Sequence, residues 1–163
     1  MSHQQVKKKK EALMANIHPY IALNNTKEAL AYYEEVLGAK NIRRVPVAAE
    51  QAKEFGLSEE QAAEMTMHSQ FDILGTTIMA ADNFQHEALS YTGISILLDL
   101  NSEDKEAMAE AQEFWKHLSD SGKVTINMPF EEQFWGGAMG DFTDKYGVRW
   151  MLHAQPYSKL GEM

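Results

Sequence analysis

An internal repeat limits the possible folds of this chain more than any other feature. The segment KEALA at residues 27–31 has a counterpart in KEAMA at residues 105–109, and each follows a stretch with the alternation of a strand. Each of the two helices that these segments predict is followed by an extended stretch and a hairpin signal. A repeat of about 60–80 residues is too long for most solenoid units and indicates duplication within one domain. We therefore expect an α+β fold made of two strand–helix–strand–strand–strand (βαβββ) modules.

The first module is expected to span residues 16–85. It begins with a strand at 18–24, after which Asn25 is placed to cap a helix. That helix is predicted to end at Gly38, because glycine adopts the left-handed conformation of a helix end at little cost. The acidic, alanine-rich segment 48–65 predicts two short helices inserted between strands.

A hairpin is predicted at Leu74 and Gly75, between two strands of this module. With that turn, Gln70 lies opposite Met79, and successive side chains alternate between the faces of the sheet. One face is apolar and is expected to pack on a helix; it carries Phe71, Ile73 and Ile78. The opposite face is mixed and is the better candidate for a site; it carries His68, Gln70, Asp72, Met79 and Ala81.

The second module is expected to span residues 92–156. It contains a strand at 93–100 and a helix whose cap is Asn101 or Ser102. The segment EEQFWGGAMG at 131–140 is interpreted as one bent strand, because glycines within strands mark bulges or close backbone approach.

Both modules are expected to share one domain of residues 16–156. The flanking residues are interpreted as tails: 1–15, which contains the basic run Lys7–Lys10, and 157–163.

Composition excludes several classes of protein. The chain has no cysteine, which excludes disulfides, thiolate metal sites and a cysteine nucleophile. The net charge of −9 argues against nucleic acid and anionic membranes as partners. No stretch approaches the roughly 20 apolar residues of a membrane span, and the start of the chain has no signal-peptide character, so a cytoplasmic protein is expected.

Five short motifs carry a resemblance to a known family. They are PY-x-A-L near residue 19, KEALAYY from 27, MHSQF at 67–71, PFEEQFWGG at 129–137 and D-x-x-G-V-x-W at 144–150. Together they resemble the vicinal oxygen chelate superfamily, which includes glyoxalase I, extradiol dioxygenases and bleomycin-resistance proteins. Within it, the chain is similar to the PhnB-like group, also described as 3-demethylubiquinone-9 3-methyltransferase-like. The resemblance spans residues 18–156. It implies curled mixed sheets with the helices on the outer face, and a homodimer.

The metal site of this superfamily is not expected here. The resemblance places its ligand positions on His18, Met79, Ile94 or Ser95, and Met151. Thioether and apolar side chains bind hard or borderline cations poorly, so no metal cofactor is predicted. A second arrangement, with His18, His68 and His153 as ligands, has no recognised spacing. A glycine-rich loop for a methyl donor is also absent from the sequence.

A pocket for a small molecule is the site that the sequence favours. His68 is the candidate catalytic residue, either as a general base or as a hydrogen-bonding partner of the ligand, although a structural histidine would fit equally well. The other candidate ligand-binding residues are Tyr20, Gln70, Gln133 and Trp135 as walls, with Met79 and Met151 as an apolar floor. Glu131 and Glu132 are adjacent and point to opposite faces of a strand, so they cannot form a facing carboxylate pair.

Three functions remain open at this stage. The first is the binding of a small aromatic or apolar molecule without a metal. The second is an enzyme of the glyoxalase or dioxygenase kind, with an atypical metal site that includes His68. The third is a non-catalytic interaction module. The ligand, and whether it reacts, stay undetermined by the residues alone.

Overall fold

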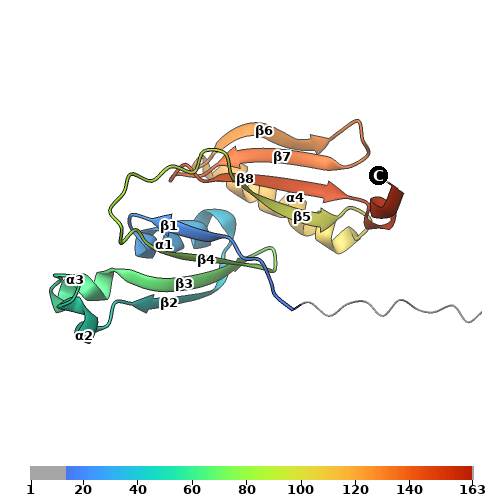
Figure 1. The fold of residues 1–163 in the computed structure, drawn as a ribbon. Coiled ribbons are helices and arrows are strands. Elements are labelled where there is room, and N and C mark those ends of the chain that lie inside the picture. Colours follow the sequence, from blue (N-terminus) through green and yellow to red (C-terminus); the bar gives the residue numbers. More distant parts are fainter. Residues whose placement is uncertain (1–13, 163) are drawn as a thin grey trace, which may run out of the picture.

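A computed structural model describes residues 14–162, and the basic run Lys7–Lys10 lies outside them. The chain folds as two consecutive βαβββ modules (Figure 1). The first comprises β1 (Tyr20–Leu23), α1 (Thr26–Leu37), β2 (Lys40–Pro46), α2 (Ala49–Ala52), α3 (Glu59–Glu64), β3 (Thr66–Ile73) and β4 (Thr76–Asp82). The second comprises β5 (Ser95–Asn101), α4 (Lys105–Ser121), β6 (Thr125–Glu132), β7 (Ala138–Thr143) and β8 (Arg149–Gln155), followed by the 3-10 helix η1 (Tyr157–Glu162).

Each module forms a four-stranded mixed sheet. The strand orders are β1-β4-β3-β2 and β5-β8-β7-β6, so corresponding strands of the two modules take the same place in their sheets. In each sheet the first and last strands of the module pair in parallel, and the other pairs are antiparallel. The two sheets do not close into a barrel. The predicted α+β fold with duplicated modules is confirmed.

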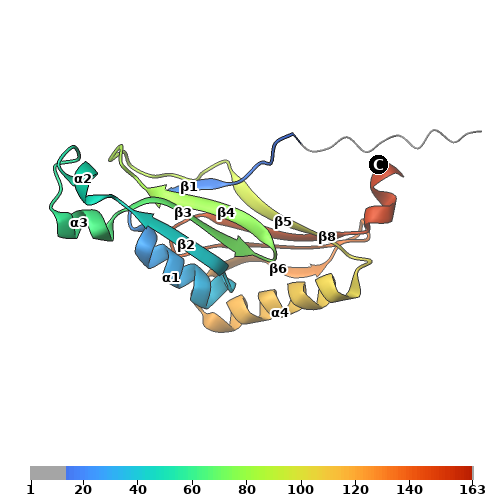
Figure 2. The ribbon, with the colours of Figure 1, turned by 90° about the horizontal axis from the view of Figure 1, so that it is seen from below.

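Both long helices lie on the same side of the sheets, as Figure 2 shows for α1 and α4. Their apolar faces and the facing strands form one continuous core across the two modules. The opposite face of each sheet, called the helix-free face below, is covered by neither α1 nor α4, and the 3-10 helix η1 lies at one end of this face of the second sheet. No helix in residues 14–162 has the length and apolar character of a membrane span.

Helix α1 begins and ends where the sequence predicts. The Asn25 side chain accepts a hydrogen bond from the backbone N–H of Glu28 at 3.1 Å, which satisfies one of the free donors of the first turn. Gly38 ends the helix with φ of 65°, a conformation that costs glycine little. The two short helices expected in segment 48–65 are also present, as α2 and α3.

Helix α4 has a different cap from the one predicted. Asp104 accepts hydrogen bonds from the backbone N–H groups of Glu106 and Ala107, at 3.0 and 3.1 Å. The prediction of Asn101 or Ser102 was wrong because the preceding strand ends one residue later than expected. Asn101 is the last residue of β5, and the chain needs a further turn before the helix begins.

The hairpin between β3 and β4 has the predicted register. Gln70 pairs with Met79 and Phe71 with Ile78. Leu74 and Gly75 both have positive φ, at 49° and 78°, as a two-residue hairpin loop of type I′ requires. The apolar face of the hairpin is fully buried against α1, so the polar face must look away from the helices.

The motif D-x-x-G-V-x-W joins the two modules through a buried carboxylate. Asp144 Oδ2 accepts hydrogen bonds from the hydroxyl of Tyr33, on α1, at 2.6 Å and from the indole N–H of Trp150 at 3.0 Å. Asp144 Oδ1 accepts from the backbone N–H groups of Tyr146 and Val148. Burial raises the pKa of Asp144, and the four hydrogen bonds oppose that rise.

The stretch EEQFWGGAMG is a hairpin and not the single bent strand that we predicted. Strand β6 ends at Glu132 and β7 begins at Ala138. The backbone N–H of Gln133 donates to the carbonyl of Gly137 at 2.7 Å, which closes the loop. Gly136 has φ of 89°, so the glycines of this stretch serve a reversal of the chain.

The C-terminal segment, expected as a tail, is docked on the second sheet. Residues 157–162 form η1. The backbone N–H of Tyr157 donates to the side chain of Asn101, and Ser158 donates to Glu103 through both its backbone N–H and its hydroxyl. The end of the chain is thereby held beside β5.

Candidate functional site

The helix-free face of each sheet carries most of the candidate residues. On the first sheet, Tyr20 pairs with Met79, which pairs with Gln70 across the strands. On the second sheet, Leu97 pairs with Met151. Met79 and Met151 therefore hold equivalent positions on the last strand of each module, beside the first strand. The neighbouring side chains Ile21 and Leu98 point the other way, into the core.

His68 has a partner that the sequence did not reveal. Its Nδ1 lies 3.1 Å from the hydroxyl of Tyr20, and the two ring centroids are 5.8 Å apart. The two residues come from β3 and β1, with β4 between them, so only the strand order brings them together. Tyr20 is 57% exposed, which leaves its ring open to a ligand.

Gln133 and Trp135 lie in the loop between β6 and β7. The Gln133 amide donates to the carbonyl of Glu131 at 3.2 Å, so this side chain supports the loop. The indole of Trp135 stacks on the imidazole of His153, with ring centroids 5.0 Å apart and an interplanar angle of 29°. Of the two, Trp135 thus reaches the helix-free face that contains His153 and Met151.

Asp99 is a residue of this face that sequence reasoning missed. Its carboxylate accepts hydrogen bonds from His153 Nδ1 at 2.6 Å and from the hydroxyl of Tyr157 at 3.0 Å. The Gln155 amide donates to both of its oxygens at 3.2 Å. One signal was present: Asp99 is the single charged residue in the predicted strand 93–100. Its pairing with His153 depends on the parallel register of β5 and β8.

The residues at the positions that the resemblance assigns to metal ligands do not fit a divalent cation. His18 directs Nδ1 to the carbonyl of Thr77 at 3.1 Å, while Met79 and Met151 offer only thioethers. Within residues 14–162, no three His, Cys, Asp or Glu side chains gather as a ligand set. The alternative set of His18, His68 and His153 is therefore not assembled within the described chain.

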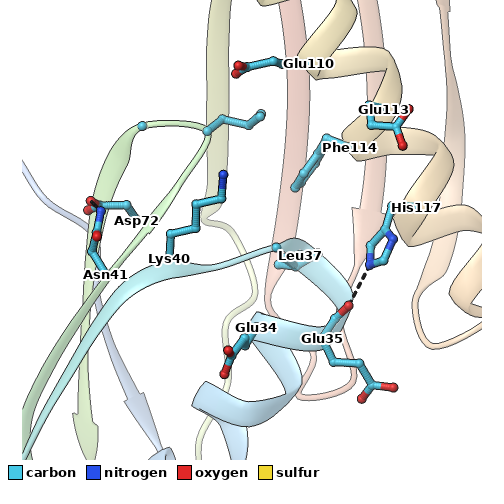
Figure 3. Close-up of a pocket in the computed structure, with 13 residues that line it drawn as sticks. Glu34, Glu35, Leu37, Lys40, Asn41, Asp72, Glu110, Glu113, Phe114 and His117 are labelled. Carbon is cyan, nitrogen blue, oxygen red and sulfur yellow. Dashed lines mark hydrogen bonds between the residues drawn. The ribbon is translucent and has the colours of Figure 1, made fainter.

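A well-formed concave region lies elsewhere, between the modules (Figure 3). It is a groove of about 620 Å³ bounded by the end of α1, the β3–β4 hairpin and α4. Phe114 lies in the groove, surrounded by carboxylates such as Glu34 and Glu110. His117 Nε2 contacts the carbonyl of Glu35 at 2.7 Å and links the two helices at one end. None of the predicted site residues lines this groove, so the groove and the predicted site lie in different parts of the protein.

Paired βαβββ modules of this topology define the glyoxalase and bleomycin-resistance class of folds. FosX from Listeria monocytogenes, a fosfomycin resistance protein, aligns with a TM-score of 0.56 at 15% identity, covering 91% of this chain and 98% of FosX. Protein PA1353 from Pseudomonas aeruginosa aligns with the same TM-score at 31% identity, covering 87% of this chain and 98% of PA1353.

The sequence comparison narrows this class to one family. A family model described as 3-demethylubiquinone-9 3-methyltransferase matches residues 15–153. Protein YjdN from Escherichia coli (strain K12) is 30% identical over 144 residues, which is 84% of this chain and 93% of YjdN. The chain belongs to this PhnB-like family, as the motifs predicted.

Proposed function

We propose that this protein binds a small aromatic or apolar molecule on the helix-free faces of its sheets, without the family's usual metal. The observation that supports this most is the side-chain content of those faces. Tyr20 is 57% exposed, Leu97 47% and Trp135 41%, and each lies near a methionine or a histidine. Exposed apolar and aromatic surface with a few placed polar groups is typical of ligand sites.

Each candidate residue has a role in this proposal. Met79 and Met151 form an adaptable floor, since a thioether side chain accommodates ligands of different shape. Trp135 supplies a flat surface for stacking. Tyr20 and His68 hydrogen-bond the ligand as a pair, with His68 as the group able to take a proton. Gln70 lies beside Met79 as a further polar wall, and Gln133 braces the loop that presents Trp135.

The ligand site is proposed to be enclosed by a second copy of the chain. A helix-free face is open on one side, so a single chain leaves the ligand in contact with water. Val45, at 53% exposure, and Leu97 add to the apolar surface that a homodimer would cover. The protein is proposed to act in the cytoplasm, and its charge of −9 argues against nucleic acid or anionic membranes as partners.

A metal-dependent enzyme is the second candidate. One structure of FosX from Listeria monocytogenes contains Mn(II) and sulfate, and that protein has the same fold. In this alternative, His68 binds a metal together with residues of the second copy. Elemental analysis of protein purified without a histidine tag separates the candidates, because a stoichiometric divalent metal that is lost in His68→Ala supports the enzyme. The third candidate, an interaction module, predicts no small-molecule ligand at all.

A thermal-shift screen with aromatic compounds and metabolites tests the proposal. A ligand at about 100 times its Kd stabilises the native state by about 2.7 kcal/mol. For a chain of this size, that corresponds to a rise in Tm of about 5–10 °C. Tyr20→Phe and His68→Gln are expected to reduce the shift, while His86→Gln, in an exposed loop, serves as the matched control. A library without any hit, or a hit that ignores Tyr20 and His68, would contradict the proposal.

A further inference from the structure

The imidazole of His153 is held in one orientation by Asp99. The distance from Nδ1 to Oδ1 is 2.6 Å, and the two residues are register partners on β8 and β5. An ionised carboxylate only accepts hydrogen bonds, so Nδ1 must carry the proton of this bond. Nε2 of the neutral ring is then the basic nitrogen. Among the described side chains, none makes a hydrogen bond to it.

The Asp99 carboxylate accepts hydrogen bonds from two side chains besides His153. Gln155 donates from β8, and the hydroxyl of Tyr157 donates from η1. Burial raises the pKa of Tyr157, and its hydrogen bond to Asp99 raises it further, so this hydroxyl remains a donor near neutral pH. The docked C-terminal helix therefore helps to hold Asp99 against His153.

Trp135 covers one face of the imidazole because of the glycines beside it. A Cβ on Gly137 would lie 1.9 Å from the Trp135 ring and 2.3 Å from the carbonyl of Ala154. Glycine at this position lets the loop fold back far enough for the indole to stack on His153. The adjacent Phe134 is fully exposed, so the loop presents aromatic surface beside the ring.

The rest of the surroundings is apolar or acidic. Met139, on β7, is the cross-strand partner of His153, and Glu131, on β6, is the partner of Met139. The carboxylates on this face of the neighbouring strands are those of Asp99 on β5, Asp141 on β7 and Glu131 on β6. The side chains of His153 and Asp99 are 17% and 31% exposed, so the pair is sheltered but within reach of a ligand.

We propose that Asp99 and His153 form a proton-accepting dyad for an aromatic ligand that carries an acidic hydroxyl group. The ligand ring lies beside Trp135 and directs its hydroxyl to Nε2. The O–H bond breaks, its electron pair stays on the ligand oxygen, and the proton forms the N–H bond at Nε2. The products are a bound oxyanion and an imidazolium that Asp99 stabilises. This step needs no further reactant. It rests on the proposed function, because the ligand must first occupy the helix-free face.

The probe for this test is 4-hydroxyacetophenone, a weaker acid than 4-nitrophenol, whose anion has its own absorption band. The titration is done near pH 7, about one pH unit below the pKa of the free probe, where about one tenth of the probe is ionised and an ordinary imidazole is mostly neutral. Binding is followed separately by quenching of tryptophan fluorescence, to which Trp135 contributes. With the wild-type protein we expect the ionised fraction of bound probe to rise about fivefold.

Three variants separate proton transfer from structure. His153→Gln is expected to abolish the rise in ionised probe while the protein stays folded. Asp99→Asn, a change at a positioning residue, is expected to reduce the rise with binding largely kept. Tyr157→Phe removes a structural bond to Asp99 and leaves the imidazole intact, so it is expected to keep most of the rise.

Other results would overturn the dyad. No quenching at probe concentrations of about 1 mM would exclude this class of ligand from the second sheet. Quenching without extra anion, or an equal rise in His153→Gln, would show that His153 accepts no proton. Those two results would leave the binding proposal standing, because the thermal-shift screen tests binding independently.

Discussion

Removing the Tyr33 hydroxyl tests how the two modules are joined. In Tyr33→Phe the buried Asp144 loses a 2.6 Å hydrogen bond and keeps its other three donors. A hydrogen bond to a charged group contributes about 1.5–3 kcal/mol. We therefore expect the free energy of unfolding to fall by about 2 kcal/mol at neutral pH, and Tm to fall by about 4–8 °C.

The loss of unfolding free energy in Tyr33→Phe should depend on pH in a defined direction. Because burial raises the pKa of Asp144, the native state binds its proton more tightly than the unfolded chain does. The stability from this group is full below the unfolded pKa and declines as the pH rises through the folded pKa. The Tyr33 bond lowers that folded pKa, so Tyr33→Phe raises the pKa of Asp144 further and makes the total decline in stability larger. The destabilisation should thus be largest at neutral pH and shrink as the pH falls.

Urea denaturation between acidic and neutral pH measures the loss of unfolding free energy in Tyr33→Phe. The control is Tyr32→Phe, whose hydroxyl donates at 2.6 Å to the carbonyl of Lys123 and accepts at 3.1 Å from the backbone N–H of Lys145, both neutral partners. It should cost about 1 kcal/mol, with less dependence on pH. A double-mutant cycle with Asp144→Asn gives the coupling between the partners. A coupling near zero, or a loss that grows in acid, would refute the reasoning.

Three further experiments test separate parts of the structure. Gly137→Ala should destabilise the protein by about 1–3 kcal/mol and shift the tryptophan emission, because the added Cβ would overlap Trp135. Gly136→Ala is the control: its added Cβ meets no neighbouring atom, so it should cost only the strain of a positive φ, about 1–2 kcal/mol. Equal emission spectra for the two variants would argue against the stacked indole. Asp104→Ala should lower the unfolding free energy by about 1 kcal/mol through loss of the α4 cap, and an unchanged urea midpoint would speak against that cap. Light scattering should give the mass of two chains, and a single-chain mass at high concentration would contradict the homodimer.

Local signals in the sequence were enough to predict the modules. Asn25 and Gly38 are residues whose own chemistry starts and ends a helix, so α1 required no tertiary information. The same is true of the hairpin at Leu74 and Gly75, where the turn geometry sets the register of the strands.

The contacts within the site were harder to predict because they cross between strands. Tyr20 meets His68 only because β4 lies between β1 and β3, and Asp99 meets His153 only through a parallel register. The loop at Trp135 was interpreted as strand because glycine serves both bulges and turns. A single sequence without a known strand order does not distinguish these arrangements.

Binding of a small organic molecule to the helix-free sheet faces without a metal can be observed at the methionines of those faces. The measurement is NMR of protein labelled at the methionine methyl groups, recorded in EDTA with a ligand from the thermal-shift screen. Signals assigned by Met79→Leu and Met151→Leu report on the two floor residues, and Met108, on α4, reports on the opposite side. We expect the Met79 and Met151 signals to shift on saturation while the Met108 signal does not. Unchanged signals at both floor positions, or shifts that appear only after a divalent metal is added, would contradict it.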